Sequence, residues 1–142
     1  MTNIPFDNPN EVLPLVDEQG QVVGKTLRGE CHDGTKKLHP VVHLHVFDAE
    51  GRLYLQRRPS WKKIQPNRWD TAVGGHIGYG ETVAEALERE AYEELGLSGF
   101  EAASIEQYVY ESTCEREFVH VFCTRTAVAP TPCLLYTSPS PR

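Results

Sequence analysis

Three glutamates stand close together in the segment REAYEELGL, residues 89–97, at Glu90, Glu93 and Glu94. In a helix, residues three and four positions apart lie on one face, so these carboxylates would point in the same direction. Oxygen ligands at this spacing suit Mg²⁺ or Mn²⁺, which keep several waters and bridge to the phosphates of a substrate. A solvated acidic face is the alternative, but the helix dipole disfavours acids near a C-terminal end. We therefore predict that this cluster binds a metal ion.

The helix that carries the glutamates is well marked at both ends. Thr82 and Glu85 fit a capping box, which predicts that the helix begins directly after Thr82. Gly96 stands where a left-handed C-terminal cap is expected. Arg89 is four residues from both Glu85 and Glu93, so we expect it to pair with them and to hold a carboxylate in place. The expected buried stripe consists of Ala84, Leu87, Ala91 and Leu95.

A longer pattern surrounds this helix. Its residues are Gly75, Glu81, Arg89, Glu90, Ala91, Glu93, Glu94, Gly96 and Leu97. The spacing resembles the Nudix box, G-x5-E-x7-R-E-U-x-E-E-x-G-U, in which U is a bulky aliphatic residue; Ala91 is smaller than usual at its position. The resemblance implies a Nudix fold of class α/β (α+β), with a mixed β-sheet sandwiched between helices. It also implies hydrolysis of a nucleoside diphosphate linked to a group X, by attack of water on phosphorus.

The same resemblance implies roles for individual residues. Glu90 and Glu94 would be metal ligands, and Glu93 would be a further ligand or would orient the water. The carbonyl of Gly75 would complete the shell, and Glu117, from the strand region after the helix, would be a ligand or a base. The expected catalytic set is Glu93, Arg89, Glu94 and Glu117. The expected metal set is Gly75, Glu90, Glu93, Glu94 and Glu117, with Mg²⁺ or Mn²⁺ as cofactor.

A second pattern resembles isopentenyl-diphosphate isomerase, a member of the Nudix superfamily, over roughly residues 11–127. It consists of His32, His39, His76, Glu115 and Glu117, in the order in which the isomerase places its metal-binding histidines and glutamates. The resemblance implies a second metal site at His32, His39, His76 and Glu115. Unrelated surface or core histidines are the alternative.

One position departs from the isomerase pattern. The isomerase requires a cysteine directly before its glycine-histidine pair, to move a proton at carbon, and this sequence has Gly74 there. Glycine has no side chain with which to move a proton. The sequence therefore resembles an isomerase-like Nudix hydrolase. The isomerase itself and a non-catalytic, nucleotide-sensing Nudix module remain as alternatives.

A basic segment precedes the box. Residues 52–68, RLYLQRRPSWKKIQPNR, contain no acid, which suits a polyanionic ligand that arrives with metal. Arg57, Arg58 and Lys62 are the expected substrate-binding residues, because Arg binds phosphate in a bidentate manner and Lys acts as a flexible point charge. Adjacent strand residues point to opposite faces, so we expect only one of the two arginines to reach the site. Solvated loop residues are the alternative for each.

Composition limits the partners. The net charge of -6 argues against general nucleic-acid binding, which usually needs a basic face. No apolar run approaches membrane-spanning length, and the start of the chain shows no signal-peptide pattern. The four cysteines form no C-x-x-C pair, which favours reduced thiols and a cytoplasmic location. We expect a small-molecule diphosphate as partner, no nucleic acid and no membrane, and we leave a homodimer open.

The length of 142 residues suits one domain. We expect a Nudix domain at residues 1–129, with one hairpin around residues 18–20, another around residues 50–51, a short glycine-containing strand before the helix, and two strands after it. Residues 130–142 are rich in Pro and Ser, so we expect a non-native or disordered tail and expect C-terminal elements of the fold to be missing.

Overall fold

The computed structural model describes residues 8–57, 69–127 and 136–140. Its elements in chain order are β1 (Val12–Val16), β2 (Val22–Leu27), the 3-10 helix η1 (Arg28–His32), β3 (Leu38–Phe47), β4 (Leu53–Arg57), β5 (Trp69–Thr71), β6 (Val73–His76), α1 (Val83–Leu95), β7 (Ala103–Glu111), β8 (Arg116–Arg125) and β9 (Tyr136–Ser140). Both expected hairpins, the glycine-containing strand, the helix and the two later strands are confirmed. No described helix is both long and apolar enough to cross a membrane.

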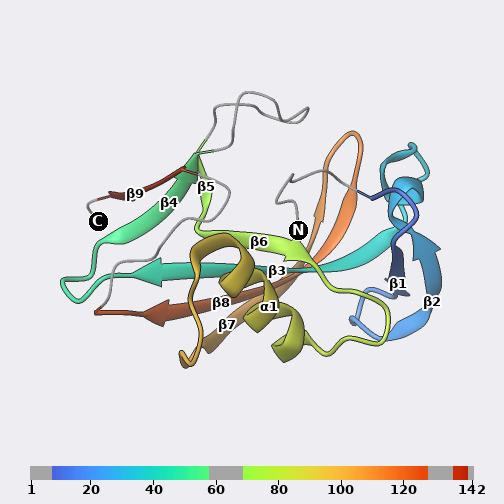
Figure 1. Ribbon diagram of the computed structural model, residues 1–142. Coiled ribbons are helices and arrows are strands. Elements are labelled where there is room, and N and C mark those ends of the chain that lie inside the picture. The colour runs from blue at the N-terminus through green and yellow to red at the C-terminus, as the bar shows by residue number, and fades with distance from the viewer. Residues whose placement is uncertain (1–7, 58–68, 128–135, 141–142) are drawn as a thin grey trace.

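Most strands belong to one mixed sheet in the order β5-β4-β3-β8-β7 (Figure 1). At its centre β3 and β8 run parallel, with Leu38 opposite Arg116 and Phe47 opposite Arg125. The pairs of β3 with β4 and β6, and of β7 with β8, are antiparallel. The expected α+β class with a mixed sheet is therefore confirmed. Among the described residues α1 is the one α-helix, so they show only one of the two helical layers of the expected sandwich.

The segment expected to be a tail contains a strand in its described part. The backbone of β9 pairs antiparallel with β4, with Tyr136 opposite Arg57 and Ser140 opposite Leu53. The expectation of no regular structure here is wrong for these five residues. Side-chain periodicity did not predict the strand, but an extended, proline-containing backbone can pair along an exposed strand. The domain boundary at residue 129 stays a prediction.

Helix α1 begins and ends where local chemistry predicts. Thr82 Oγ1 accepts a hydrogen bond from the Glu85 N–H at 3.1 Å, and the Glu85 carboxylate accepts one from the Thr82 N–H at 2.9 Å. Gly96 has a φ of 68°, a left-handed conformation that glycine adopts without strain, and its N–H donates to the Tyr92 carbonyl. The capping box and the glycine cap are both confirmed.

One face of α1 covers β3 and β6. Its buried residues are Ala86, Leu87, Ala91 and Leu95, and they pack against a core that includes Val42, Leu44, Val46, Val73 and Ile77. Each fully buried Leu or Val side chain contributes about 1.5–3 kcal/mol relative to exposure, so this interface fixes the helix on the sheet. The expected stripe was wrong at Ala84, which is exposed. Ala84 lies in the first turn at the margin of the buried face, and Ala86 contributes to that face instead.

The N-terminal hairpin holds η1 against the start of the central strands. The Arg28 N–H donates to the Glu11 carbonyl at 2.8 Å, and the Tyr79 N–H donates to the Val12 carbonyl at 3.2 Å. A small cluster of Val16, Leu38 and Phe118 is buried between this hairpin and the large sheet. These contacts place the end of η1 beside the first residues of β3 and β8.

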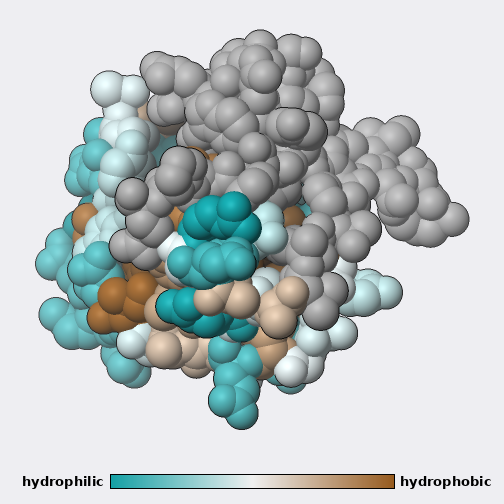
Figure 2. All heavy atoms as spheres, turned by 90° about the vertical axis from the view of Figure 1, so that its left-hand side faces the viewer, coloured by the Kyte–Doolittle hydropathy of each residue, from teal (hydrophilic) through white to brown (hydrophobic). Residues whose placement is uncertain are grey.

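Strand β7 lies at one end of the sheet order and is exposed along its whole length. Its exposed side chains include Ile105, Tyr108, Val109 and Tyr110. On the coloured part of the surface seen from the left-hand side of Figure 1, hydrophilic and hydrophobic residues are mixed (Figure 2).

Candidate active site

Glu90 lies directly against Gly75, because α1 packs closely on β6. A Cβ atom at residue 75 would overlap the Glu90 carboxylate, so only glycine permits this approach. The contact brings together two of the residues predicted to bind metal. It also places a carboxylate next to the backbone of β6.

Glu94 follows Glu90 by one helical turn, so the two carboxyl groups lie on the same face of α1. Burial raises the pKa of Glu90, and the charge of Glu93 acts in the same direction, although the Glu94 side chain and Arg89 oppose them. Glu93 itself is more than half exposed, at 53%. A cation beside Glu90 and Glu94 would offset the effect of burial on the Glu90 charge, which makes this pair a good candidate for metal binding.

Arg89 connects the helix to the loop and strand before it. Its Nε and Nη2 donate to both oxygens of Glu81, at 2.8 and 3.0 Å. Nη2 also donates to the His76 carbonyl at 3.1 Å. Nη1 donates to Glu90 at 3.0 Å and to Glu93 at 3.4 Å. Arg89 therefore holds two acids of the cluster in position, and its expected contact with Glu93 is confirmed.

The expected contact between Arg89 and Glu85 is wrong. The Glu85 carboxylate accepts the Thr82 N–H in the capping box, whereas Glu81 accepts from the Gly78 N–H at 2.9 Å and from Arg89. The hydrogen bond from Arg89 lowers the pKa of Glu81, with the Gly78 N–H adding to the effect. Glu81 precedes the helix, so its contact with Arg89 arises from the fold of the loop rather than from helical spacing.

Five residues assemble at the starts of β3 and β8. His39 stands opposite Glu117 in the parallel register, and the two side chains approach to 3.9 Å. The His39 and His76 rings are stacked, with centroids 5.2 Å apart, and the His32 ring lies 6.1 Å from each. His32 Nδ1 lies 3.3 Å from a Glu115 carboxylate oxygen. The predicted histidine and glutamate set is thus brought together by η1, β3, β6 and β8.

Three of these residues fit a divalent cation. One ligand atom each from His39, His76 and Glu117 lie within 4.8 Å of one another. Neighbouring ligand atoms around an ion with bonds of about 2.1 Å lie about 3–3.4 Å apart, so the group would contract by up to about 1.5 Å on binding one. The Nε2 atoms of His39 and His76 are buried and have no hydrogen-bond partner among the described residues. Each such nitrogen costs about 1–3 kcal/mol unless something binds it.

The protonation of the histidines suits the same use. His39 Nδ1 lies 2.9 Å from the Lys37 carbonyl, so it carries the proton and leaves Nε2 as a lone-pair donor. Burial lowers the pKa of His39, and burial with the nearby Arg28 charge lowers that of His76 further. Both imidazoles are therefore held neutral, which is the form that binds metal. Nitrogen and carboxylate ligands together suit Mn²⁺, Mg²⁺ or Zn²⁺.

The two candidate metal centres lie on opposite faces of β6. In the antiparallel register His76 pairs with Val41 and Gly75 pairs with Val42, so successive residues face opposite sides. Gly75 faces Glu90 on α1, whereas His76 lies on the face that carries His39. One short strand thus fixes both groups.

Comparison with known proteins places this arrangement in a family. The family model described as the NUDIX domain matches residues 37–137 of this chain. The chain belongs to the Nudix family. It is 39% identical over 94 residues to the Nudix hydrolase SCO1686 of Streptomyces coelicolor. The aligned residues cover 66% of this chain and 51% of that protein. It is 35% identical over 127 residues to the isopentenyl-diphosphate Delta-isomerase of Streptomyces griseus, covering 85% of this chain and 64% of the isomerase. The chain therefore spans about half to two thirds of the length of these relatives.

A solved structure confirms the Nudix fold. DR0079 from Deinococcus radiodurans superposes with a TM-score of 0.75 at 29% identity, covering 92% of this chain and 83% of that one. The isomerase-like resemblance is also shown, since the relatives include both Nudix hydrolases and isopentenyl-diphosphate isomerases.

Some predicted Nudix site residues lie outside the described structure. Arg58 and Lys62 are outside the described residues, and of Arg57 only the backbone is described, at the end of β4. Their substrate-binding role stays a prediction. The sequence analysis missed Arg28, whose charge lowers the pKa of both His39 and His76. No local spacing could have indicated it, because residues four apart in a 3-10 helix do not lie on the same side.

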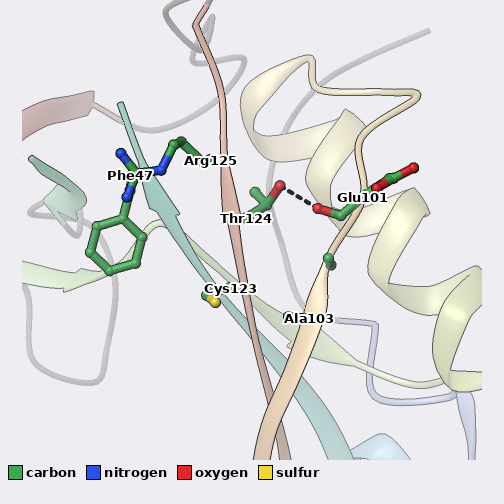
Figure 3. A pocket seen from close by; sticks show the side chains of 7 residues that line it. Phe47, Glu101, Ala103, Cys123, Thr124 and Arg125 are labelled. Atoms are coloured by element: carbon green, nitrogen blue, oxygen red, sulfur yellow. Dashed lines mark hydrogen bonds between the residues drawn. The ribbon is translucent and has the colours of Figure 1, made fainter. Parts of the chain in front are cut away.

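A separate pocket of about 450 Å³ lies at the far ends of β3 and β8 (Figure 3). It is lined by Phe47, Glu101, Ala102, Ala103, Cys123, Thr124 and Arg125. Thr124 Oγ1 donates to the Glu101 carbonyl at 2.6 Å across its wall. The pocket contains none of the predicted Nudix site residues, so it is not the candidate active site.

Proposed function

We propose that this chain is a divalent-metal-dependent hydrolase that cleaves a diphosphate linkage in a nucleoside diphosphate-X or a related organic diphosphate. The observation that carries this proposal is the Glu90 carboxylate, which is held against Gly75 and anchored by Arg89, with Glu93 and Glu94 on the same face of the helix. Carboxylates gathered at a half-buried position repel one another, and a bound cation offsets this repulsion. Membership of the Nudix family, with relatives named as Nudix hydrolases, supports the same reaction.

The chain's own residues would have different roles in this reaction. Glu90 and Glu94 would hold the cation, with the Gly75 carbonyl beside them, and Arg89 would keep Glu90 and Glu93 in position. Glu93, which is exposed, would orient the attacking water. The bound cation, Mg²⁺ or Mn²⁺, would neutralise charge on the diphosphate oxygens and lower the pKa of a bound water.

The histidine cluster supports a second cation site within the same proposal. His39, His76 and Glu117 would be its ligands, with His32 and Glu115 adjacent. This assignment is supported by the buried Nε2 atoms of His39 and His76, which have no hydrogen-bond partner in the part of the chain that the structure describes. A cytoplasmic location is part of the proposal, because Cys31, Cys114 and Cys123 are free thiols.

Isopentenyl-diphosphate isomerisation is the second candidate, favoured by the histidine and glutamate cluster and by the isomerases among the relatives. Gly74 disfavours it, because no side chain stands at that position to move a proton at carbon. The hydrolase proposal needs no such group.

Phosphorus NMR of a diphosphate panel with Mg²⁺ tests the proposal. The panel holds nucleoside triphosphates, nucleotide sugars and isopentenyl diphosphate. We expect new phosphate resonances with the wild-type protein, and a rate at least about a hundredfold lower with Glu94→Gln, since one metal ligand is worth several kcal/mol. Glu88→Gln, on an exposed residue of the same helix, is the matched control and should retain full activity. Binding without new resonances in any panel member would instead indicate a nucleotide-sensing module.

A further inference from the structure

Strand β7 has a free edge. It is the last strand in the sheet order β5-β4-β3-β8-β7, and among the described strands only β8 pairs with it (Figure 1). All nine of its residues are exposed. An edge strand of this kind presents a row of backbone N–H and C=O groups with which another strand can pair. Three adjacent bulky side chains of β7, Tyr108, Val109 and Tyr110, are each 37–47% exposed.

The direction of the backbone groups follows from the turn that closes the β7–β8 hairpin. The Ser112 N–H donates to the Glu115 carbonyl at 2.9 Å, so the backbone groups of Ser112 face β8. Along an antiparallel strand, residues whose groups face the partner strand alternate with residues whose groups face away from it. The N–H and C=O groups of Gln107, Val109 and Glu111 therefore point away from β8.

The sequence around Val109, QYVYE, reads nearly the same in both directions. A second copy of β7 can run antiparallel along this edge with Val109 opposite its own counterpart. Tyr108 of each copy then lies opposite Tyr110 of the other, and Gln107 lies opposite Glu111. In this register the outward backbone groups of residues 107, 109 and 111 face one another and form about six hydrogen bonds.

Side-chain pairing favours the same register. Tyr108 and Tyr110 of opposite copies lie at positions without backbone hydrogen bonds, where side chains approach most closely and aromatic pairs are favourable. Glu111 lies opposite Gln107, whose amide can donate to it, and Lys36 Nζ already balances its charge at 3.0 Å. No acid of β7 stands directly opposite or diagonal to another acid, although each copy carries a net charge of -6.

Other symmetric registers fit less well. Centred on Gln107 or Tyr108, the paired segment would include the bulge between Ser104 and Glu106, where the regular alternation ends. With Gln107 at the centre, the Glu106 side chains of the two copies would also repel each other across a diagonal of about 7–8 Å. A register centred on Tyr110 would extend past the end of β7 into the turn.

We propose that β7 pairs antiparallel with β7 of a second copy of this chain, in the register centred on Val109, and so joins two sheets into one. This interface is independent of the proposed hydrolase function. A strand pair of this length buries less than the about 1,200–2,000 Å² of a stable interface, so the dimer is weak and depends on protein concentration.

Sedimentation velocity of the full chain, at about 5–500 µM, tests the pairing. We expect dimers of the wild-type protein in the upper part of this range. Val109→Lys and Val109→Glu should each weaken dimerisation at least about tenfold, because like charges then stand directly opposite each other. An equimolar mixture of these two variants should restore the dimer, since Lys then faces Glu. Val23→Lys is the matched control, because Val23 is a 61% exposed valine on another strand, β2.

A further variant tests the register. Gln107→Lys places a cation opposite Glu111 twice in each dimer, so dimerisation should strengthen about two- to tenfold. In a register centred on Gln107 the same change would set Lys opposite Lys and weaken the dimer, so an unchanged or weaker dimer would overturn the register.

Three results would overturn the interface itself. They are a wild-type protein that stays monomeric at about 500 µM, Val109 variants that dimerise as the wild type does, and a mixture of Lys and Glu variants that stays monomeric. Circular dichroism and melting temperature would show that each variant is folded. Loss in the single variants with recovery in the mixture would support pairing through Val109.

Discussion

Glu81→Gln tests whether Arg89 is held by the carboxylate that precedes the helix. Glu81 accepts two hydrogen bonds from Arg89, at 2.8 and 3.0 Å, and one from the Gly78 N–H. Its side chain is 20% exposed, so this ion pair is partly shielded from water. Glutamine keeps the shape of the side chain but removes the charge. It also turns an amide N–H toward a guanidinium that can only donate.

The expected loss of stability is about 2 kcal/mol. Hydrogen bonds to a charged group contribute about 1.5–3 kcal/mol each when buried, and the variant loses one of the two from Arg89. Partial exposure places the value at the lower end of that range. For a chain of this size, such a loss lowers the melting temperature by about 6 °C. Thermal unfolding of the wild-type protein, Glu81→Gln and the exposed control Glu88→Gln would measure it.

The pH dependence gives a second readout of the same contact. The pKa of Glu81 lies below its usual 4.5 in the folded protein, so its stabilising effect is fully present above that pH and is lost as the pH falls through the lowered value. The difference between wild type and Glu81→Gln should therefore be largest at neutral pH and should shrink below about pH 4.5. A difference below 0.5 kcal/mol at pH 7, or one that does not change on acidification, would refute this account of the Arg89 anchor.

Two further predictions concern the metal centres. Gly75→Ala should weaken Mg²⁺ binding at least about tenfold, because its methyl group displaces the Glu90 carboxylate; calorimetry would measure this, and unchanged affinity would contradict the proposed role of the close contact. His39→Asn should weaken Mn²⁺ binding at the histidine cluster at least about tenfold while leaving the Glu90 site intact, as followed by competitive titration of Mn²⁺ with Mg²⁺. A loss of both sites in that variant, with the fold intact by circular dichroism, would show that the two centres are not independent.

Features set by neighbouring residues in the chain were predictable from the sequence. The capping box of Thr82 and Glu85 and the left-handed Gly96 depend on backbone groups within a few residues, so residues close in sequence determine them. Ala84 shows the limit of this reasoning. Helical spacing puts it near the apolar stripe, but its burial depends on where the sheet lies beneath the first turn, which spacing does not encode.

Contacts between distant segments were predictable only in part. Helical spacing predicts Glu85 as a partner of Arg89, whereas the observed contact with Glu81 depends on the loop that Gly78 helps to shape. The resemblance to the isomerase placed His39 and Glu117 in one site, but alternation alone could not give the parallel register that sets them opposite each other. The effect of the Arg28 charge on the pKa of His39 and His76 was missed, because it depends on where η1 lies relative to these histidines.

The arrangement around β6 bears on how hydrolysis and isomerisation differ in this fold. Gly75 and His76 face opposite sides of the strand, and each belongs to one candidate metal centre. Gly74 belongs to neither centre. A change at this position can therefore remove the proton-moving group that an isomerase needs while leaving all the proposed metal ligands in place. Since a Cβ at residue 74 would meet only ordinary contacts, the packing did not force glycine there.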